Sequence, residues 1–342
     1  MKAVILKIVP IVFCFSIVAC DKEEDNTLRD LLLLNALTNQ ACVNTGTPRY
    51  FSSSGNFSQA SAAYSVDGSC WTATRLTGAA GMSGLAFANN TFVGVGSPST
   101  PSAYSATDFT GTWTAGTGLS GTGVLVDVVH TGTRFVAVGV RQLYYSSDGS
   151  AWTAATSATT ARLDQVISIS YMGGTRQVAV GSLVNSGVAI FSNDHGDNWT
   201  ATTTMPAVNK FLGVAYSGTR LVAVGASGAC AYSDDGGANW TQCTLPTTAT
   251  SQYNGITYAN GRFVAVSSGG EGIYYSSDGI SWTASSLNGL TSASDGLAFG
   301  GDRFVVTGPT PGYSTDGINW TPGQLAAGSA FSPFTGERTI YK

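Results

Sequence analysis

Apolar residues alternate with polar ones in short runs along most of the chain, and Gly, Ser, Thr, Asn or Asp separate these runs. In one recurring pair of runs, two alternating segments flank a Gly, Asn or Asp that suits a positive φ, which is the pattern of an antiparallel hairpin. This pattern predicts six hairpins, with the sequences GLAFANNTFVGVG at 84–96, DVVHTGTRFVAVG at 127–139, SISYMGGTRQVAVG at 168–181, GVAYSGTRLVAVG at 213–225, GITYANGRFVAVS at 255–267 and GLAFGGDRFVVTG at 296–308.

A second motif contains an aromatic residue, Ser, Asp, Gly and Trp, and each of the seven tryptophans of the chain closes one copy of it. Six copies are clear: YSVDGSCWT at 64–72, YSSDGSAWT at 145–153, FSNDHGDNWT at 191–200, YSDDGGANWT at 232–241, YSSDGISWT at 275–283 and YSTDGINWT at 313–321. A weaker copy, YSATDFTGTWT, covers 104–114. Each copy supplies two further strands, so one repeat unit contains four.

The tryptophans stand at positions 71, 113, 152, 199, 240, 282 and 320, with intervals between 38 and 47 residues. A period near forty residues, built from short strands, is typical of a β-propeller. Helical repeats of this period would need amphipathic runs of ten or more residues, and the repeat region has none. We therefore predict an all-β, seven-bladed β-propeller of four-stranded blades.

The two ends of the chain are expected to share one blade. Six hairpins of the first kind lie between the first and last Trp, so we assign the seventh to SAFSPFTGERTIYK at 329–342. This hairpin would complete the blade begun by 64–74, and Tyr50-Phe51 is expected to add a strand to the closure. Such pairing of N- and C-terminal strands leaves no unpaired edge.

The Trp motif resembles the Asp box, or BNR repeat, of sialidases, sortilin-type receptors and photosystem II assembly-factor-like proteins. The family pattern is Ser/Thr, any, Asp, any, Gly, any, any, Trp. Segments 192–199 and 233–240 have that spacing, and the other clear copies are one residue shorter. The resemblance covers about residues 50–342 and implies structural boxes on the face away from the ligand site. The expected box residues are Ser65, Asp67, Trp71, Asp148, Trp152, Asp194, Trp199, Asp235, Trp240, Asp278, Trp282, Asp316 and Trp320.

Local chemistry also favours a structural role for the box. Asp and Ser can bind the N–H groups of their own turn, Gly takes the left-handed conformation, and Trp can pack one blade against another. An arginine also recurs at the start of the second strand, and a residue repeated in this way is expected to belong to the scaffold. These arginines are Arg134, Arg176, Arg220, Arg262, Arg303 and Arg338.

The N-terminus carries an export signal. Lys2 and Lys7 precede the apolar run 8–18, which is too short to span a bilayer stably. The run ends in Ile-Val-Ala-Cys20, which resembles the lipobox of bacterial lipoproteins and implies cleavage before Cys20 and its acylation. We expect a signal peptide at 1–19, a lipidated spacer with a short helix at 20–48, and the propeller at 49–342. An ordinary secretory signal with a chance cysteine is the alternative.

Four cysteines remain in the exported domain, and an oxidising compartment favours disulfides. The register that places Ser233 opposite Trp240 also pairs Cys230 with Cys243, which leaves Cys42 for Cys70. Metal binding is the weaker alternative, because no CxxC occurs and the histidines are limited to His130 and His195. We expect neither a metal nor a cofactor.

Charged residues make up 11% of the chain, and its formal net charge is −4. Loss of Lys2 and Lys7 with the signal peptide would make the charge −6, from 14 basic and 20 acidic residues. A mildly acidic protein argues against nucleic acid and against anionic membrane surfaces as partners. The expected membrane contact is the lipid anchor, and we expect a monomer.

Polar residues that break the repeat are the candidates for a ligand site, because function requires something that the scaffold does not repeat. Asp127 replaces the Gly or Ser that starts other first strands and is expected to point into the central channel, and His130 stands where other blades carry Tyr or Phe. The remaining candidates lie in loops of the face opposite the boxes: Arg75, Arg141, Arg162, Asp164, Lys210, Tyr253 and Glu271.

Catalysis has little support in the sequence. Sialidases use three arginines, a Tyr–Glu pair and an Asp acid/base, but their Arg-Ile-Pro segment is absent and Glu271 is the one glutamate outside the spacer and the repeat turns. We therefore predict a non-enzymatic scaffold, lipid-anchored in the bacterial cell envelope and facing the periplasm or the exterior, that binds a protein or glycan. The alternatives are a sialidase-like glycoside hydrolase with an altered site, and a lectin, which the dissimilar loops disfavour.

Overall fold

The computed structural model describes residues 42–54, 61–96, 102–120, 123–157, 160–246, 252–268, 272–290, 296–308, 310–326 and 338–342. The chain divides into two units, Met1–Ala41 and Cys42–Lys342, and every described residue belongs to the second. The expected signal peptide, the lipidated Cys20 and most of the spacer, including its helix, therefore lie outside the described residues. Within the described ranges, no helix is long and apolar enough to cross a membrane.

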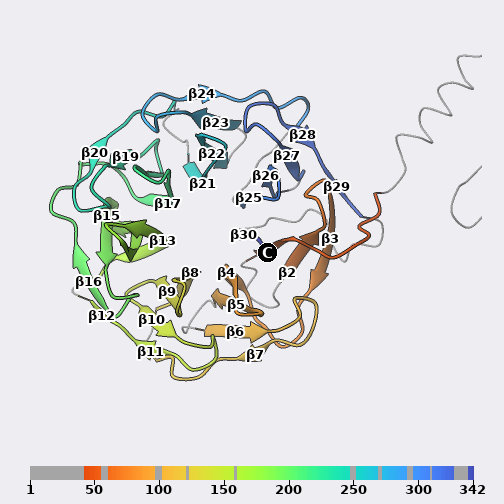
Figure 1. Ribbon diagram of the computed structural model, residues 1–342, viewed down its shortest axis with the longest axis horizontal. Helices are drawn as coiled ribbons and strands as arrows, with labels where there is room; N and C mark the ends of the chain where they lie inside the picture. The colour runs from red at the N-terminus through yellow and green to blue at the C-terminus, as the bar shows by residue number, and fades with distance from the viewer. Residues whose placement is uncertain are drawn as a thin grey trace, which may run out of the picture. The chain divides into compact units, whose positions relative to one another are not determined.

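The second unit is a ring of seven sheets, the blades of a propeller (Figure 1). In every blade the first strand borders the central channel and the fourth lies at the rim. Blade 1 consists of β4 (Met82–Ala88), β5 (Thr91–Gly96), β6 (Ser102–Ala106) and β7 (Thr114–Ala115). Blade 2 consists of β8 (Leu125–His130), β9 (Phe135–Gly139), β10 (Leu143–Ser146) and β11 (Thr153–Ala154). Blade 3 consists of β13 (Arg162–Tyr171), β14 (Gly174–Leu183), β15 (Ser186–Ser192) and β16 (Asn198–Ala201), with β12 (Thr156–Ser157) beside β16.

The remaining blades follow the same order from channel to rim. Blade 4 consists of β17 (Phe211–Tyr216), β18 (Leu221–Gly225), β19 (Cys230–Ser233) and β20 (Thr241–Gln242). Blade 5 consists of β21 (Gln252–Ala259), β22 (Arg262–Ser268), β23 (Gly272–Ser276) and β24 (Thr283–Ala284). Blade 6 consists of β25 (Leu297–Gly300), β26 (Arg303–Val306), β27 (Gly312–Ser314) and β28 (Thr321–Pro322). The terminal blade consists of β30 (Arg338–Tyr341), β1 (Tyr50–Ser54), β2 (Ser61–Ser65) and β3 (Cys70–Arg75), with β29 (Gln324–Leu325) beside β3.

The prediction of seven four-stranded blades, closed by strands from both ends of the chain, is confirmed. The assignment of strands within the closing blade was wrong. The C-terminus supplies the first strand, β30, and β1 at Tyr50 supplies the second, so 329–342 does not provide both. Tyr50 pairs with Ser65 as Phe135 pairs with Ser146, which identifies Tyr50–Ser54 as the regular second strand.

Links between blades reinforce the ring. After its fourth strand, the chain runs parallel to the fourth strand of the next blade, as in the pairing of Thr156 with Asn198 and of Gln324 with Cys70. Isolated parallel bridges have the same role at four other joints, at Thr77–Thr112, Thr117–Ala151, Thr204–Asn239 and Ser286–Asn319. These links extend the hydrogen bonding of each sheet to its neighbour.

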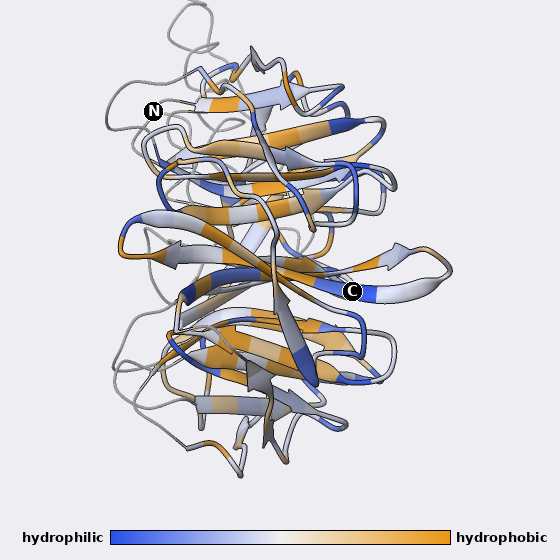
Figure 2. Ribbon diagram, turned by 90° about the vertical axis from the view of Figure 1, so that its left-hand side faces the viewer, coloured by the Kyte–Doolittle hydropathy of each residue, from blue (hydrophilic) through white to orange (hydrophobic). Residues whose placement is uncertain are grey.

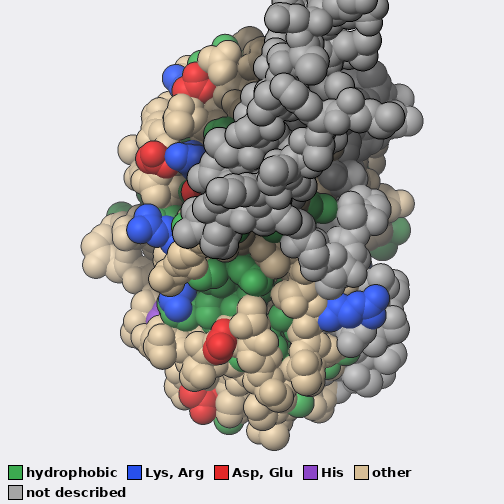
Figure 3. Space-filling view, turned by 90° about the vertical axis from the view of Figure 1, so that its right-hand side faces the viewer, with side chains coloured by type: hydrophobic (Ala, Val, Ile, Leu, Met, Phe, Trp, Pro, Cys, Tyr) green, Lys and Arg blue, Asp and Glu red, His purple; other side chains and the backbone are tan. Residues whose placement is uncertain are grey.

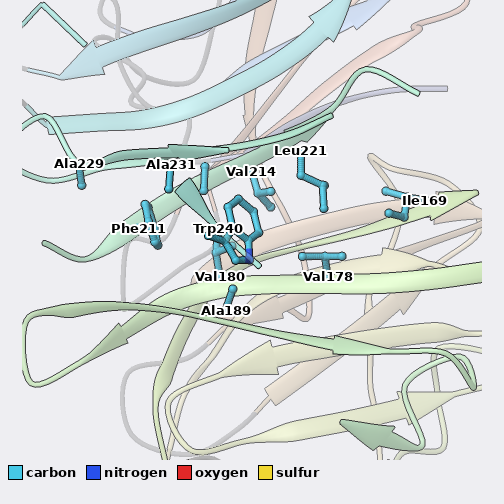
Figure 4. Close-up of a cluster of buried hydrophobic side chains, with 11 residues drawn as sticks. Ile169, Val178, Val180, Ala189, Phe211, Val214, Leu221, Ala229, Ala231 and Trp240 are labelled. Carbon is cyan, nitrogen blue, oxygen red and sulfur yellow. The ribbon is translucent and has the colours of Figure 1, made fainter. Parts of the chain in front are cut away.

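The hydrophobic core is divided among the joints between blades, because each sheet buries both of its faces against neighbours. Seven apolar clusters occupy the seven joints. Figure 4 shows the one between blades 3 and 4, where Val178 and Val180 face Phe211 and Trp240. The apolar bands of the strands in Figure 2 belong to these clusters.

Strand direction defines two faces of the ring. The turn between the first and second strands and the box turn between the third and fourth lie on the same face, which we call the box face. The second-to-third turns and the links between blades lie on the opposite face. Blade 3 projects beyond blade 2 on both faces (Figure 2), because its pairing continues to Tyr171–Gly174 at one end and Leu183–Ser186 at the other.

Candidate functional site

The box turns are rigid hydrogen-bonded elements. In blade 2 the hydroxyl of Ser146 donates to Asp148 at 3.0 Å and accepts from the Gly149 N–H at 2.9 Å. Asp148 in turn accepts from the N–H groups of Ser150 and Ala151 at 2.8 and 3.0 Å. The carboxylate thus satisfies groups of its own turn and is not presented to a ligand. The same Ser–Asp bond recurs in blades 3 to 6, through Asp194, Asp235, Asp278 and Asp316.

These hydrogen bonds lower the pKa of the box carboxyls. For Asp148 and Asp278 the largest cause is a backbone N–H, donated by Ala151 and Ser281 respectively. For Asp316, partial burial acts in the opposite direction, but the backbone and side-chain N–H groups of Asn319 and the N–H of Ile318 lower the pKa to about 2. The box carboxylates are therefore fully ionised at neutral pH.

The box tryptophans close the same turns. The indole N–H of Trp152 donates to the Gly149 carbonyl at 3.1 Å, and equivalent bonds hold Trp71, Trp199, Trp240 and Trp320. In the weak copy of blade 1, Phe109 replaces the glycine and still accepts from Trp113 at 3.0 Å. Trp282 differs, because its buried indole nitrogen has no hydrogen-bond partner among the described residues.

The recurrent arginines join neighbouring blades. Arg134 of blade 2 donates to the carbonyls of Asp194 and His195 in blade 3, at 2.6 and 2.9 Å, and lies over the ring of Tyr145 in its own blade. Arg176, Arg220 and Arg262 make the same connection to the next box turn. One member of the predicted set was wrong, since Arg338 pairs with Ser53 in the first strand. Arg49 immediately precedes the second strand of that blade, as Arg134 precedes Phe135.

Both cysteine pairs are bonded in the structure. Cys42 joins Cys70 with their Cα atoms 5.7 Å apart, and Cys230 joins Cys243 at 5.0 Å. The first bond fastens the segment before β1 to the terminal blade, where Asn44 also binds the carbonyl of Tyr64 at 2.9 Å. In the described part of the chain, no three His, Cys, Asp or Glu side chains gather as a metal site would require.

The central channel is the largest cavity described, with a volume of about 610 Å³. Its wall is formed by the first strands of all seven blades, from the level of Asp127 and Gln165 to the ends of the strands at the box face. Six aromatic side chains line it near the box face, one from each blade except blade 3. They are Phe87, His130, Tyr216, Tyr258, Phe299 and Tyr341, and we call them the aromatic collar.

Asp127 does line the channel, but it is 1% exposed and accepts a hydrogen bond from the Val166 N–H of blade 3 at 2.9 Å. Gln165 occupies the same register position in blade 3 and accepts from the Val214 N–H of blade 4. In blade 1 the position is Gly84, where an added Cβ would lie 2.7 Å from the Asp127 Cα. These residues connect adjacent first strands, which is a structural role.

Four of the remaining candidates come together on the opposite face, over blades 2, 3 and 4. Val140 forms a bridge with Arg162, so that Arg141 and Arg162 are close in space, and the Arg141 N–H donates to Ala161 at 3.1 Å. The guanidinium of Arg162 binds Asp164 at 2.6 Å, and Lys210 acts electrostatically on the same carboxylate from blade 4. Arg141, Arg162, Asp164 and Lys210 form what we call the basic cluster.

Asp164 is the buried member of this cluster. It occupies the irregularity in β13 between Leu163 and Gln165, and it is 8% exposed. Burial raises the pKa of its carboxyl, an effect that Arg162 and Lys210 partly offset. Its Oδ2 has no hydrogen-bond partner within the described ranges. With three cations around one buried carboxylate, the cluster keeps a net positive charge.

The other candidates do not join the cluster. Tyr253 is fully buried, with its hydroxyl donating to the Pro246 carbonyl, so its assignment to the ligand face was wrong. Arg75 is exposed at the end of β3, in the terminal blade. Glu271 lies outside the described residues.

An exposed apolar turn stands next to the basic cluster. Val184 is 90% exposed at the turn between β14 and β15, and Arg162 pairs with Ser182, two residues before it. Val184 and Asn185 have φ of 49° and 67°, and the first value is unfavourable for a β-branched residue. Sequence patterns missed this turn because the repeats contain no counterpart for the longer strands of blade 3. Elsewhere, as on the side shown in Figure 3, charged side chains are few and scattered.

No protein-family model matches this sequence, and no curated protein matches it either. Two solved structures are similar in fold. One is YCF48 bound to a D1 peptide, with a TM-score of 0.53 and 18% identity over 70% of this chain and 81% of that chain. The other is the computationally designed Ika8 protein, with a TM-score of 0.51 and 9% identity over 84% of this chain and 97% of that chain. At these identities the similarity establishes the fold, and this chain is thus a β-propeller of the kind found in YCF48.

Proposed function

We propose that this protein is a lipid-anchored component of the bacterial envelope that binds a protein partner and has no catalytic activity of its own. The observation that carries the binding role is the turn of blade 3, where Val184 is 90% exposed in an unfavourable backbone conformation beside three basic side chains. An exposed apolar anchor with a charged surround is a common arrangement in protein interfaces. A left-handed residue with a Cβ costs about 1–2 kcal/mol, and such strain is found mainly at functional sites.

The chemistry of the cluster indicates the partner. Arg141, Arg162 and Lys210 favour an acidic segment, because guanidinium groups bind carboxylates through paired hydrogen bonds. Val184 and the half-exposed Leu183 favour an apolar side chain within that segment. The solved structure of YCF48 with a bound D1 peptide supports a peptide-binding role for this propeller architecture, although the site itself is argued from the residues of blade 3.

Photo-cross-linking in the native envelope tests the position of the interface. A photoreactive residue replaces Val184 in one variant and Met172 in the other, and we expect a partner adduct from Val184 alone. Met172 is a matched control, because it is 89% exposed at the opposite end of the same blade. Equal adducts from both positions, or an adduct from Met172 alone, would contradict the proposed site.

The charge requirement has its own test. Reversal of two cluster charges, by Arg141→Glu with Arg162→Glu, should reduce the Val184 adduct at least tenfold and make the remaining adduct insensitive to salt. Arg75→Glu, an exposed arginine on the terminal blade, should leave the adduct unchanged. An adduct that survives the double reversal would eliminate the basic cluster as the partner's binding site.

The lipid anchor is tested separately. Cys20→Ala removes the thiol that would carry the lipid, so the protein should move from the membrane to the soluble fraction. Its persistence in washed membranes would rule out anchoring through Cys20. Fractionation of inner and outer membranes from the unmodified strain would then identify the membrane that holds the lipoprotein.

A further inference from the structure

We infer that the box-face end of the central channel is a second binding site, built for a neutral carbohydrate. This inference is independent of the proposed protein partner, because it concerns the other end of the ring. It rests on the aromatic collar, on the break in that collar at blade 3, and on the small number of charges in the channel wall.

The collar side chains are held in place from behind. Each collar residue stands opposite the first residue of its second strand, and the two rings pack together. The centroid distances are 4.5 Å for Phe87–Phe92, 4.8 Å for His130–Phe135, 4.7 Å for Tyr258–Phe263, 4.8 Å for Phe299–Phe304 and 5.1 Å for Tyr50–Tyr341. All six collar residues remain partly exposed and line the channel. Flat rings fixed in this way present apolar faces that can stack on the C–H faces of a sugar.

Blade 3 breaks the collar with a polar pair. The register places Ser168 opposite Gln177, at the positions that hold His130 and Phe135 in blade 2. Ser168 lines the channel and accepts from the Gln177 amide at 3.4 Å, so its own O–H remains able to donate. Gln177 is fully buried, and its Oε1 has no partner among the described residues. An unsatisfied polar group in an otherwise apolar ring suits a bound molecule that carries hydroxyl groups.

The wall of the channel also favours hydroxyl groups over an apolar occupant. The first strands are edge strands of their sheets, so part of their backbone N–H and C=O groups faces the channel. Asp127 and Gln165 occupy two of these N–H groups, on Val166 and Val214. A lipid chain would remove water from the remaining groups without replacing its hydrogen bonds, whereas sugar hydroxyls can bind them.

Charge argues for a neutral ligand. Among the described residues that line the channel, Asp127 and His130 are the acidic or basic side chains. The carboxylate of Asp127 is buried and hydrogen-bonded, and burial lowers the pKa of the His130 imidazole below 6.5, so this ring is neutral at pH 7. Lys342 lies over the Phe87 ring, with its Nζ 4.3 Å from the centroid, and its charge is therefore engaged. A volume of about 610 Å³ falls in the range of small-ligand sites.

Binding of short oligosaccharides to the full-length, detergent-solubilised protein tests this inference. Maltotriose, cellotriose and triacetylchitotriose serve as neutral probes, and trigalacturonic acid as the acidic one. We expect titration calorimetry to detect at least one neutral probe and to detect no binding of the acidic one. No binding by any neutral probe, or tighter binding of the acidic probe, would overturn the inference.

Substitutions then assign any binding to the collar. Tyr258→Leu keeps an apolar side chain but removes a flat ring, and Ser168→Ala removes the hydroxyl, so each should weaken binding about tenfold. Tyr275→Leu is the matched control, since this partly exposed tyrosine lies in blade 5 but outside the channel lining, and it should have no effect. Equal loss in Tyr258→Leu and Tyr275→Leu, with both variants folded by circular dichroism, would place the sugar elsewhere.

Discussion

Arg220 donates through Nη1 to the main-chain carbonyl of Asp278, which lies in the next blade, at 2.8 Å. The same guanidinium lies 4.5 Å from the ring centroid of Tyr232 and binds both carboxylate oxygens of Asp234, at 2.7 and 2.8 Å. One side chain thus joins the third strand of its own blade to the box turn of the following blade. The contact explains why arginine recurs at this position, and it predicts a stability effect without a binding effect.

Replacement of this arginine should destabilise the ring. We expect Arg220→Ala to lower the free energy of unfolding by about 1–3 kcal/mol, because it removes charge-assisted hydrogen bonds that are only partly exposed to solvent. Arg75→Ala, at an exposed position of β3, should change it by less than about 0.5 kcal/mol. Urea denaturation measures both values. Equal effects would show that Arg220 does not hold the blades together.

Acid should weaken the box turns. Their carboxyls have a lower pKa in the folded protein than in the unfolded chain, so they stabilise the fold above the unfolded value of about 4. This contribution is lost as the pH falls toward the folded value, which for Asp316 is about 2. We therefore expect the melting temperature to fall between about pH 4 and pH 2. Asp316→Asn should melt lower at pH 7 and fall less on acidification, and a parallel decline would contradict this account.

The box tryptophans should differ in what the indole N–H contributes. Trp320 is fully buried and donates to the Gly317 carbonyl at 3.3 Å, whereas the Trp282 nitrogen has no partner within the described ranges. Trp320→Phe leaves a carbonyl unsatisfied and removes packing, and should cost about 2–4 kcal/mol. Trp282→Phe should cost less, because no hydrogen bond is lost. Thermal unfolding of the two variants compares them directly, and the reverse order would refute the assignment.

The disulfides should contribute to stability independently of each other. Cys230–Cys243 and Cys42–Cys70 close segments with sequence separations of 13 and 28 residues. Loss of a bond that restricts the unfolded chain typically costs about 2–4 kcal/mol. We expect that much from Cys230→Ser with Cys243→Ser, and a further loss when dithiothreitol reduces the remaining bond. Alkylation of all four thiols without a reductant, detected by mass spectrometry, would show that the bonds are absent.

Sequence reasoning succeeded where the interactions are local. Ser146, Asp148, Gly149 and Trp152 bind one another within a single turn, so their spacing is visible in the chain and indicates one box per blade. It failed at the closing blade, where GERTIYK looked like the end of a hairpin although Arg338 begins the first strand. Arg49-Tyr50-Phe51 was the available signal, because it repeats the Arg-aromatic start of the second strands.

The candidate site followed the same division. Arg141, Arg162, Asp164 and Lys210 were chosen because they break the repeat, and their proximity could not be predicted, since it depends on the order of blades and on the irregularity in β13. Tyr253 was misassigned because a tyrosine in a loop segment and one in a core have the same local pattern. The aromatic collar was visible as single residues, but its arrangement around one channel was not.

The sequence by itself therefore determined the number of blades, the chemistry of each box turn and the closure of the ring, since these depend on contacts between residues a few positions apart. The tertiary structure decided which strand completes the terminal blade, which carboxylates join blades and which polar residues share a surface. Those features depend on strand register and strand length across joints, where residues forty or more positions apart meet. In this propeller the repeats specify the scaffold, and the departures of blade 3 from the repeat create its distinctive surfaces.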